Sequence, residues 1–218
     1  GTPPHLPVGL KCRQSTTTST TSYATTSCDW DAPLSEGGGR TAKYLTTKRI
    51  CNFASQFANV FANLKPDSQP AVIAPDESDH SLSVVHQHGS QGDVVFLLKS
   101  QKDKTPSAAI MLPNGQTVEV YFDEDRVAWL LLEANLTNGV TLSYTNLRPW
   151  AFIKNRLLVL FGPAGCDAVV CINDAAIRLK VPTGSTPFVD QADGLTFAVL
   201  NSRQIDAAYL CADGVAIG

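Results

Sequence analysis

Two groups of side chains have the residue types and spacing that chemistry requires. His80, His86 and His88 are the densest set of metal-ligand side chains, and His86 and His88 would share one face of a strand. Zinc sites use three or four ligands supported by hydrogen-bonded neighbours, and no cysteine or carboxylate at suitable spacing completes this set. We therefore predict surface or hydrogen-bonded histidines, with no bound metal and no cofactor.

The acidic run Asp123–Asp125 directly follows an apolar segment. Two carboxylates in one cleft could do acid–base chemistry, but adjacent charges between strands normally face water, so we expect a solvated turn. The chain has no glycine-rich phosphate loop, no G-x-S-x-G motif and no dinucleotide-binding fingerprint. No local motif predicts a catalytic residue, although a triad assembled in space from distant Ser, His and Asp residues stays open.

Composition and charge limit the classes of partner. The chain has 218 residues, 44% of them hydrophobic, which is enough apolar material for a sizeable core. Seventeen Lys and Arg against 20 Asp and Glu give a net charge of -3, so there is no basic field to attract nucleic acid or anionic lipid. No apolar run approaches the roughly 20 residues of a membrane helix, so no membrane partner is expected.

The six cysteines include no C-x-x-C pair. Buried thiols are the expected state, and the alternative is one or two disulfides formed in an oxidising compartment. Cys166 and Cys171 could pair only if the segment between them brought their Cα atoms to within about 7 Å. No leader opens the chain, so we expect any secretory signal to have been removed or to lie upstream, and an extracellular or periplasmic location is slightly favoured.

Residue patterns divide the chain into three parts. Residues 1–40 are rich in Pro, Ser, Thr and Gly and predict an irregular segment. Residues 41–65 carry apolar side chains at helical spacing and predict one amphipathic helix, which Pro66 ends. Residues 66–218 contain short β-branched and aromatic blocks with turn signals such as Asn114-Gly115 between them. This pattern predicts a mainly β fold, an antiparallel sandwich or barrel-like domain.

The candidate strands recur about every ten residues, with a short helical turn expected at residues 202–208. They are Ser81–His88, Asp93–Lys99, Ala108–Leu112, Thr117–Phe122, Ala128–Glu133, Thr141–Tyr144, Arg156–Phe161, Ala168–Ile172, Ala176–Val181 and Leu195–Leu200. The apolar stripe of the predicted helix would be a large exposed surface if nothing covered it, so the helix must pack on the chain's own sheet or in a homo-oligomer. That stripe comprises Ile50, Phe53, Phe57, Phe61 and Leu64.

One short segment carries a family resemblance. Residues 26–36 read T-S-C-D-W-D-A-P-L-S-E, and Gly38, Thr41, Lys43 and Tyr44 follow. This run resembles the β-galactosidases of glycoside hydrolase family 35, in which a T-S-Y-D-Y-D-A-P-L-S-E-like segment follows the eighth strand of the catalytic barrel. Residues 142–145 and 157–165 resemble the β-domain that follows that barrel.

The resemblance implies a chain that begins near the end of the barrel and continues into the β-domain. Both catalytic glutamates of the family come from earlier barrel strands, so we expect this chain alone to be inactive. The expected partner is either the missing barrel domain or a second copy of the chain in a homo-oligomer. Trp30 matches a tyrosine that lies against galactose in the family, although Cys28 replaces the other tyrosine of the segment. Trp30, flanked by Asp29 and Asp31, is therefore the implied contact for a galactoside or other carbohydrate.

Two further interpretations stay open. A stand-alone carbohydrate-binding module would present exposed aromatic side chains, and Trp150, which follows Pro149 in an expected loop, is a candidate, whereas Trp129 lies in an apolar strand and is expected in the core. A structural or assembly domain without a ligand is the other possibility. Asn135-Leu136-Thr137 matches the N-glycosylation pattern and lies before a predicted hairpin.

Overall fold

The computed structural model describes residues 11–12, 26–27, 32–35, 38–66, 81–123, 126–137, 139–211 and 214–217. Trp30, Asp29, Asp31 and His80 lie outside the described residues. The chain divides into two compact units, residues 1–48 and 49–218. In the first unit, β1 (Lys11–Cys12) pairs antiparallel with β2 (Thr26–Ser27), and Thr41 donates its amide to the Pro33 carbonyl at 3.0 Å just before α1 (Ala42–Gln56) begins.

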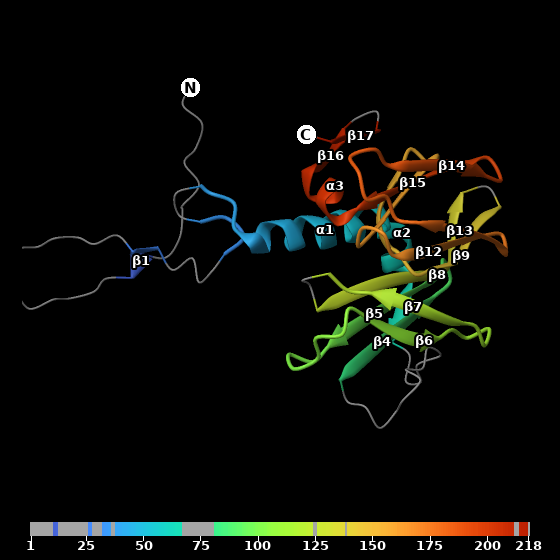
Figure 1. Ribbon diagram of the computed structural model, residues 1–218, viewed down its shortest axis with the longest axis horizontal. Helices are drawn as coiled ribbons and strands as arrows, with labels where there is room; N and C mark the ends of the chain where they lie inside the picture. The colour runs from blue at the N-terminus through green and yellow to red at the C-terminus, as the bar shows by residue number, and fades with distance from the viewer. Residues whose placement is uncertain are drawn as a thin grey trace, which may run out of the picture. The chain divides into compact units, whose positions relative to one another are not determined.

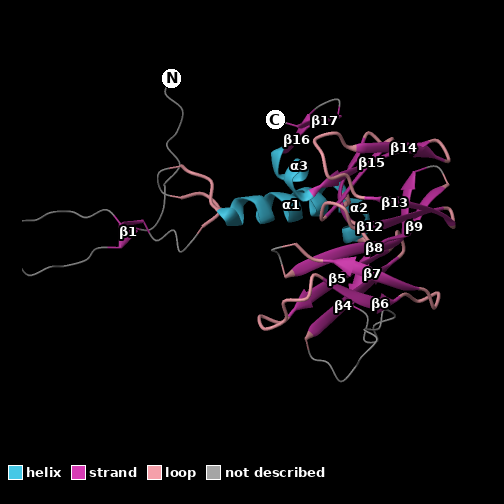
Figure 2. Cartoon of the chain, in the orientation of Figure 1, coloured by secondary structure: helices cyan, strands magenta, loops and turns pink. Residues whose placement is uncertain are grey.

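The fold is mainly β, as predicted, with antiparallel sheets, and the described strands form no closed barrel (Figures 1 and 2). The largest sheet has seven strands in the order β13-β12-β9-β8-β5-β4-β3, and each neighbouring pair is antiparallel. Its strands are β3 (Leu64–Pro66), β4 (Leu82–Gly89), β5 (Asp93–Lys99), β8 (Val127–Thr137), β9 (Val140–Thr145), β12 (Asp167–Ile172) and β13 (Ala175–Lys180).

A four-stranded sheet in the order β10-β11-β15-β14 forms the second layer. Its strands are β10 (Arg148–Ile153), β11 (Leu157–Gly162), β14 (Phe188–Ala192) and β15 (Leu195–Asn201). β11 and β15 run parallel, which is the one exception to the predicted antiparallel pairing among the named strands described here. Two separate hairpins complete the fold, β6 (Ser107–Met111) with β7 (Thr117–Tyr121) and β16 (Ala208–Cys211) with β17 (Gly214–Ile217).

The seven-stranded sheet is covered on both faces, because alternate side chains of a strand project to opposite sides. On β8, Trp129 and Leu131 belong to a core shared with the four-stranded sheet and the helices. Ala128, Leu130 and Leu132 of the same strand belong to a second core beneath the β6–β7 hairpin. The predicted core position of Trp129 is confirmed, since only 1% of its surface is exposed.

The predicted helix forms, but it is divided into α1 and the short α2 (Ala58–Ala62). Phe53 and Phe57 are buried in the core, and the Phe53 ring stacks on Trp129 with 5.7 Å between centroids. Phe61 and Leu64 also pack against this core, so the helical stripe, apart from the exposed Ile50, packs on the chain's own sheet. A homo-oligomer is not needed to cover Phe53 and Phe57, and the oligomeric state stays a prediction. The predicted helical turn near residue 202 is also present, as α3 (Ser202–Ala207).

The prediction that Trp150 is an exposed aromatic residue in a loop is wrong. Trp150 lies in β10 rather than in a loop, and none of its surface is exposed, so it cannot serve as a carbohydrate platform. Pro149 suggested a loop, but β10 is an edge strand, where a proline costs no ladder hydrogen bond. The carbonyl of Pro149 instead accepts the indole N–H of Trp129 at 2.8 Å.

Cys166 and Cys171 are free thiols, so the disulfide considered between them does not form.

Candidate functional site

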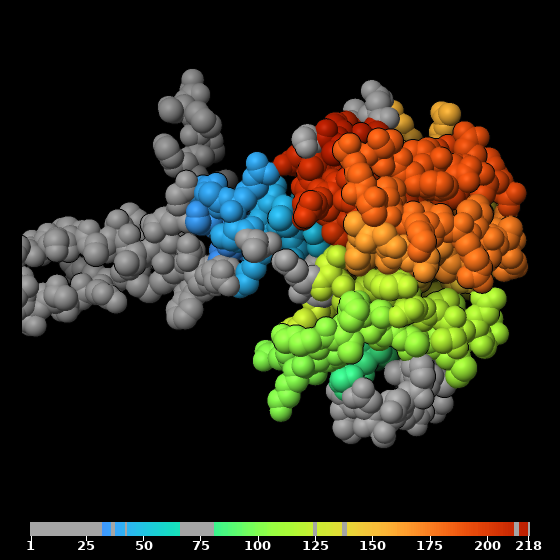
Figure 3. Space-filling model, viewed as in Figure 1, coloured from blue at the N-terminus to red at the C-terminus, as the bar shows by residue number. Residues whose placement is uncertain are grey.

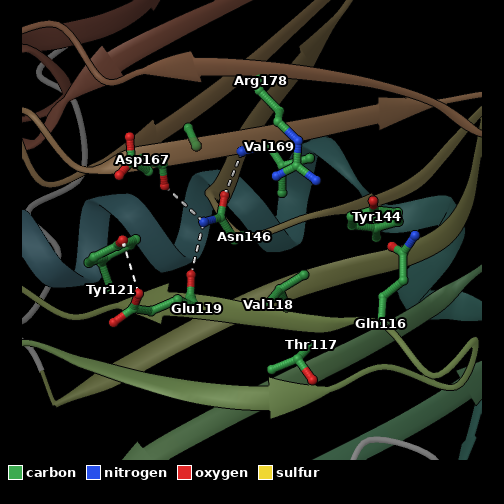
Figure 4. A pocket seen from close by; sticks show the side chains of 11 residues that line it. Gln116, Thr117, Val118, Glu119, Tyr121, Tyr144, Asn146, Asp167, Val169 and Arg178 are labelled. Carbon is green, nitrogen blue, oxygen red and sulfur yellow. Dashed lines mark hydrogen bonds between the residues drawn. The ribbon is translucent and has the colours of Figure 1, made fainter.

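A cleft of about 340 Å³ opens beside the β6–β7 hairpin. Strand β7 forms one wall, and residues of β9, β12 and β13 of the seven-stranded sheet form the other (Figure 4). In Figure 3 it opens where the green surface of the hairpin meets the orange surface of β12 and β13. The cleft lies entirely within the unit of residues 49–218.

Strand periodicity explains which side chains reach the cleft. Glu119 and Tyr121 alternate on β7 with Val120, which is fully buried in the hairpin core. Across the cleft, Arg178 pairs with Val169 and Lys180 pairs with Asp167 in the β12–β13 ladder. Directly opposed residues project from the same face of a sheet, so Asp167 and Arg178 both line this side of the cleft.

Asn146 joins the two walls. Its Nδ2 donates to the Glu119 carbonyl at 2.8 Å and to the Asp167 carbonyl at 3.0 Å, and its Oδ1 accepts the Val169 amide at 2.9 Å. The side chain thus uses both of its donors and one acceptor position on backbone groups. Because the residue is only 7% exposed, this amide acts as a rigid clamp that sets the spacing between hairpin and sheet.

Acidic and phenolic groups gather at one end of the cleft (Figure 4). Glu119 accepts hydrogen bonds from the Ser107 hydroxyl at 2.5 Å and from the Tyr121 hydroxyl at 3.3 Å. Asp167 accepts one from Lys180 Nζ at 2.7 Å. Burial first, and then the nearby Glu119 carboxylate, raise the pKa of Tyr121, so its phenol stays neutral and able to donate.

Tyr144, Gln116 and Arg178 lie at the other end of the cleft (Figure 4). Tyr144 is 6% exposed and belongs to the hairpin core, so its ring is held in place. Burial raises the pKa of Tyr144, the neighbouring Cys171 adds to that rise, and Arg178 and Gln116 oppose it. This end therefore offers a neutral phenol, an amide and a guanidinium.

The arrangement suits binding better than covalent or acid–base chemistry. The Asp167 side chain is 76% exposed and paired with an equally open lysine, so it lacks the apolar surroundings that hold a general acid protonated. Burial raises the pKa of the nearby Cys166 thiol to about 11, which keeps it protonated and poorly nucleophilic near neutral pH. The described part of the chain contains no cluster of three or more His, Cys, Asp or Glu residues able to hold a metal ion.

The residues predicted from sequence lie elsewhere. Trp30, Asp29 and Asp31 are outside the described residues, and Trp150 is buried in the core. Asn135 is exposed near the end of β8, where its Oδ1 accepts the Thr141 hydroxyl at 3.4 Å, so the predicted glycosylation position is accessible.

The predicted sharing of a face by His86 and His88 is consistent with β4, and both contact the carboxylate of Asp93. The His86 Nε2 to Asp93 Oδ2 distance is 2.8 Å, and the His88 Nδ1 to Asp93 Oδ1 distance is 2.7 Å. Asp123, expected in a solvated turn, instead pairs with the buried Arg148.

Sequence reasoning missed every polar residue of the cleft. Glu119, Tyr121 and Arg178 occupy alternating polar positions of strands, which in a single sequence indicate only a solvent-facing side.

No protein-family model matches the chain, and no curated protein matches it. Among the described helices, none is both long and apolar enough to span a membrane.

Proposed function

We propose that this chain is the non-catalytic β-sandwich part of a glycoside hydrolase-like protein, and that the cleft beside β7 binds a carbohydrate. The observation that carries the proposal is the composition of that cleft. Two tyrosines, two amides, a guanidinium and two carboxylates line about 340 Å³, a volume within the range of small-molecule sites. The resemblance of residues 26–36 to family 35 β-galactosidases supports a carbohydrate as the ligand class.

The chemistry of a sugar fits this lining. A pyranose presents hydroxyl groups around its edge and an apolar C–H face, so it needs fixed donors and acceptors together with an aromatic surface. Arg178 and Gln116 supply donors, Glu119 and Asp167 supply acceptors, and Tyr121 supplies a half-buried ring. The Asn146 clamp holds the two walls in place, which lowers the cost of ordering the site when a ligand binds.

Isothermal titration calorimetry of the full chain tests the proposal, using galactose, glucose, mannose and xylose and their β-linked trisaccharides. We expect measurable binding of at least one saccharide and a loss of about tenfold or more in Arg178→Ala and in Tyr121→Ala. The matched controls are Arg203→Ala on α3 and Tyr209→Ala on β16, exposed side chains that do not line the cleft. Both controls should bind as the unsubstituted chain does.

Two results would contradict the proposal. If no saccharide of the panel binds, the chain is a structural or assembly domain. If a saccharide binds and neither cleft variant weakens it, the carbohydrate site lies elsewhere in the chain, and the family resemblance then directs attention to Trp30→Ala.

A further inference from the structure

A second, smaller cavity of about 150 Å³ adjoins the candidate cleft at the turn of the β6–β7 hairpin. Tyr144 lines both cavities, so one side chain forms a wall common to the two. The turn residues Pro113 and Asn114 border the second cavity on the hairpin side, whereas Gln116 to Tyr121 border the first. The two cavities are therefore consecutive along one edge of the hairpin.

An unusual backbone conformation sets the rim of the second cavity. Glu133 has a φ of +48°, which is rare for a residue with a side chain. This conformation breaks the alternation of β8, since Leu132 lies in the hairpin core and Ala134 in the opposite core. Glu133 lines the cavity between them. A residue in this conformation persists only where the surrounding structure holds it in place, and such residues are concentrated at functional sites.

The lining of the second cavity combines an apolar floor with a polar rim. The buried residues Leu112, Leu132 and Tyr144 provide carbon surface, and Asp93 with the exposed Glu133 and Asn114 provides polar groups. Asp93 is fixed by His86, by His88 and by the Gly89 amide, which donates to its Oδ1 at 3.2 Å. An apolar floor with acceptors at the edge suits another pyranose ring, and the acidic rim disfavours uronic or sulfated sugars.

We propose that the two cavities are adjoining subsites of one groove, and that the ligand is a linear, neutral oligosaccharide. Its consecutive sugar units lie on either side of Tyr144, one in each cavity. This inference rests on the proposed carbohydrate-binding function. It adds a requirement that a single-sugar site lacks, namely that the affinity depends on the number of linked sugar units. The first subsite holds one end of the ligand through Arg178, and the second holds the next unit through Glu133.

Calorimetry with a monosaccharide and its linear β-linked trisaccharide tests the division into subsites, using whichever sugar type binds in the panel above. The trisaccharide should bind at least tenfold more tightly than the monosaccharide. Glu133→Ala and Asn114→Ala should each weaken trisaccharide binding at least threefold and leave monosaccharide binding unchanged. Arg178→Ala should weaken both ligands. Asp190→Asn, an exposed carboxylate change on β14, is the matched control.

The outcomes separate this inference from the function on which it rests. Equal affinity for the two saccharides, with Arg178→Ala still weakening both, would overturn the second subsite and leave the carbohydrate-binding function intact. Equal weakening of both ligands by both second-cavity variants would also overturn the division. Failure of every saccharide to bind would remove the function and the inference together. Circular dichroism spectra and melting temperatures of the variants confirm that each compared protein is folded.

Discussion

Arg148 shows how a single residue can carry a charge inside the core. It is 1% exposed, its guanidinium carbon lies 4.5 Å from the centroid of Phe161, and it forms an ion pair with Asp123. Asp123 also accepts the Ser202 hydroxyl at 2.6 Å, which connects this pair to the first residue of α3. A buried ion pair contributes little net stability as a whole, but removal of one partner leaves a charge without compensation.

Substitution of this arginine is therefore expected to be costly. Arg148→Met keeps the approximate volume and removes the charge, and it should lower the free energy of unfolding by about 3 to 5 kcal/mol. Urea denaturation followed by tryptophan fluorescence measures this change. The matched control is Lys180→Met, which removes the exposed pair with Asp167 and should cost about 1 kcal/mol or less. Equal losses in the two variants would show that Arg148 is not part of a buried ion pair.

Glu133 makes the stability of the folded protein depend on pH, and its contribution decreases as the pH rises. Burial first, and then the charges of Asp174 and Asp93, raise the pKa of Glu133 above its ordinary value of 4.5. The folded state thus holds this proton more tightly than the unfolded state does. The stability that this tighter proton binding contributes is fully present when the pH is below the pKa of Glu133 in the unfolded state. It is lost as the pH rises through the higher pKa of the folded state.

Glu133→Gln removes this titration and keeps the size of the side chain. The variant should melt at a higher temperature than the unsubstituted protein at about pH 7, and the difference should shrink as the pH falls to about 4. Thermal melts at several pH values, with Asp190→Asn as the control on β14, provide the measurement. A higher melting temperature that is the same at every pH would mean that the gain does not come from the carboxylate's titration.

At the scale of elements, the contact between helix and sheet depends on one aromatic cluster. The Phe53 ring lies 5.5 Å from Phe57, 5.2 Å from Phe61 and 5.7 Å from Trp129, measured between ring centroids. Phe53→Ala should lower the free energy of unfolding by about 3 to 5 kcal/mol, because it creates a cavity in this cluster. Ile50 is 38% exposed on the same helix, so Ile50→Ala should cost about 1 kcal/mol or less.

Chemical denaturation of the two variants measures this difference, and Phe53→Leu provides a milder change should the alanine variant fail to fold. A small loss in both phenylalanine variants would contradict the packing of the helix on the sheet.

The strands were largely predictable, because their signals are local. The predicted Asp93–Lys99 strand matches β5 at both ends, and Asn114-Gly115 forms the hairpin turn with Gly115 at a φ of +81°. Strand β10 was not predictable from alternation, since its first four residues are all buried and the order of polar and apolar residues gives no period. The cleft was not predictable either, because β9, β12 and β13 become neighbours only through the sheet order, and β7 belongs to a separate hairpin that packs beside them.

At the scale of the whole molecule, the unit of residues 49–218 has the candidate cleft and the larger core on different faces of one sheet. The face toward the four-stranded sheet and the helices is filled by aromatic and aliphatic side chains. The other face is covered by the β6–β7 hairpin, and beside that hairpin the cleft opens. A two-stranded cover on a broader sheet leaves strand surface accessible along its edge. The position of the candidate site therefore follows from the mismatch in width between the sheet and its cover.

This arrangement also leads us to expect that the chain does not hydrolyse glycosides. A retaining glycosidase needs two carboxyl groups about 5 to 5.5 Å apart, one of them kept protonated by its surroundings. Glu119 and Asp167 line the same cleft, but Asp167 is open to water beside Lys180, and Glu119 is held by Ser107 and Tyr121.

The full chain, incubated with 4-nitrophenyl β-galactoside between about pH 4 and 8, should therefore release nitrophenol no faster than buffer does. Turnover that disappears in Glu119→Gln or Asp167→Asn would show that these carboxylates form a catalytic pair, and the cleft would then be an active site rather than a binding site.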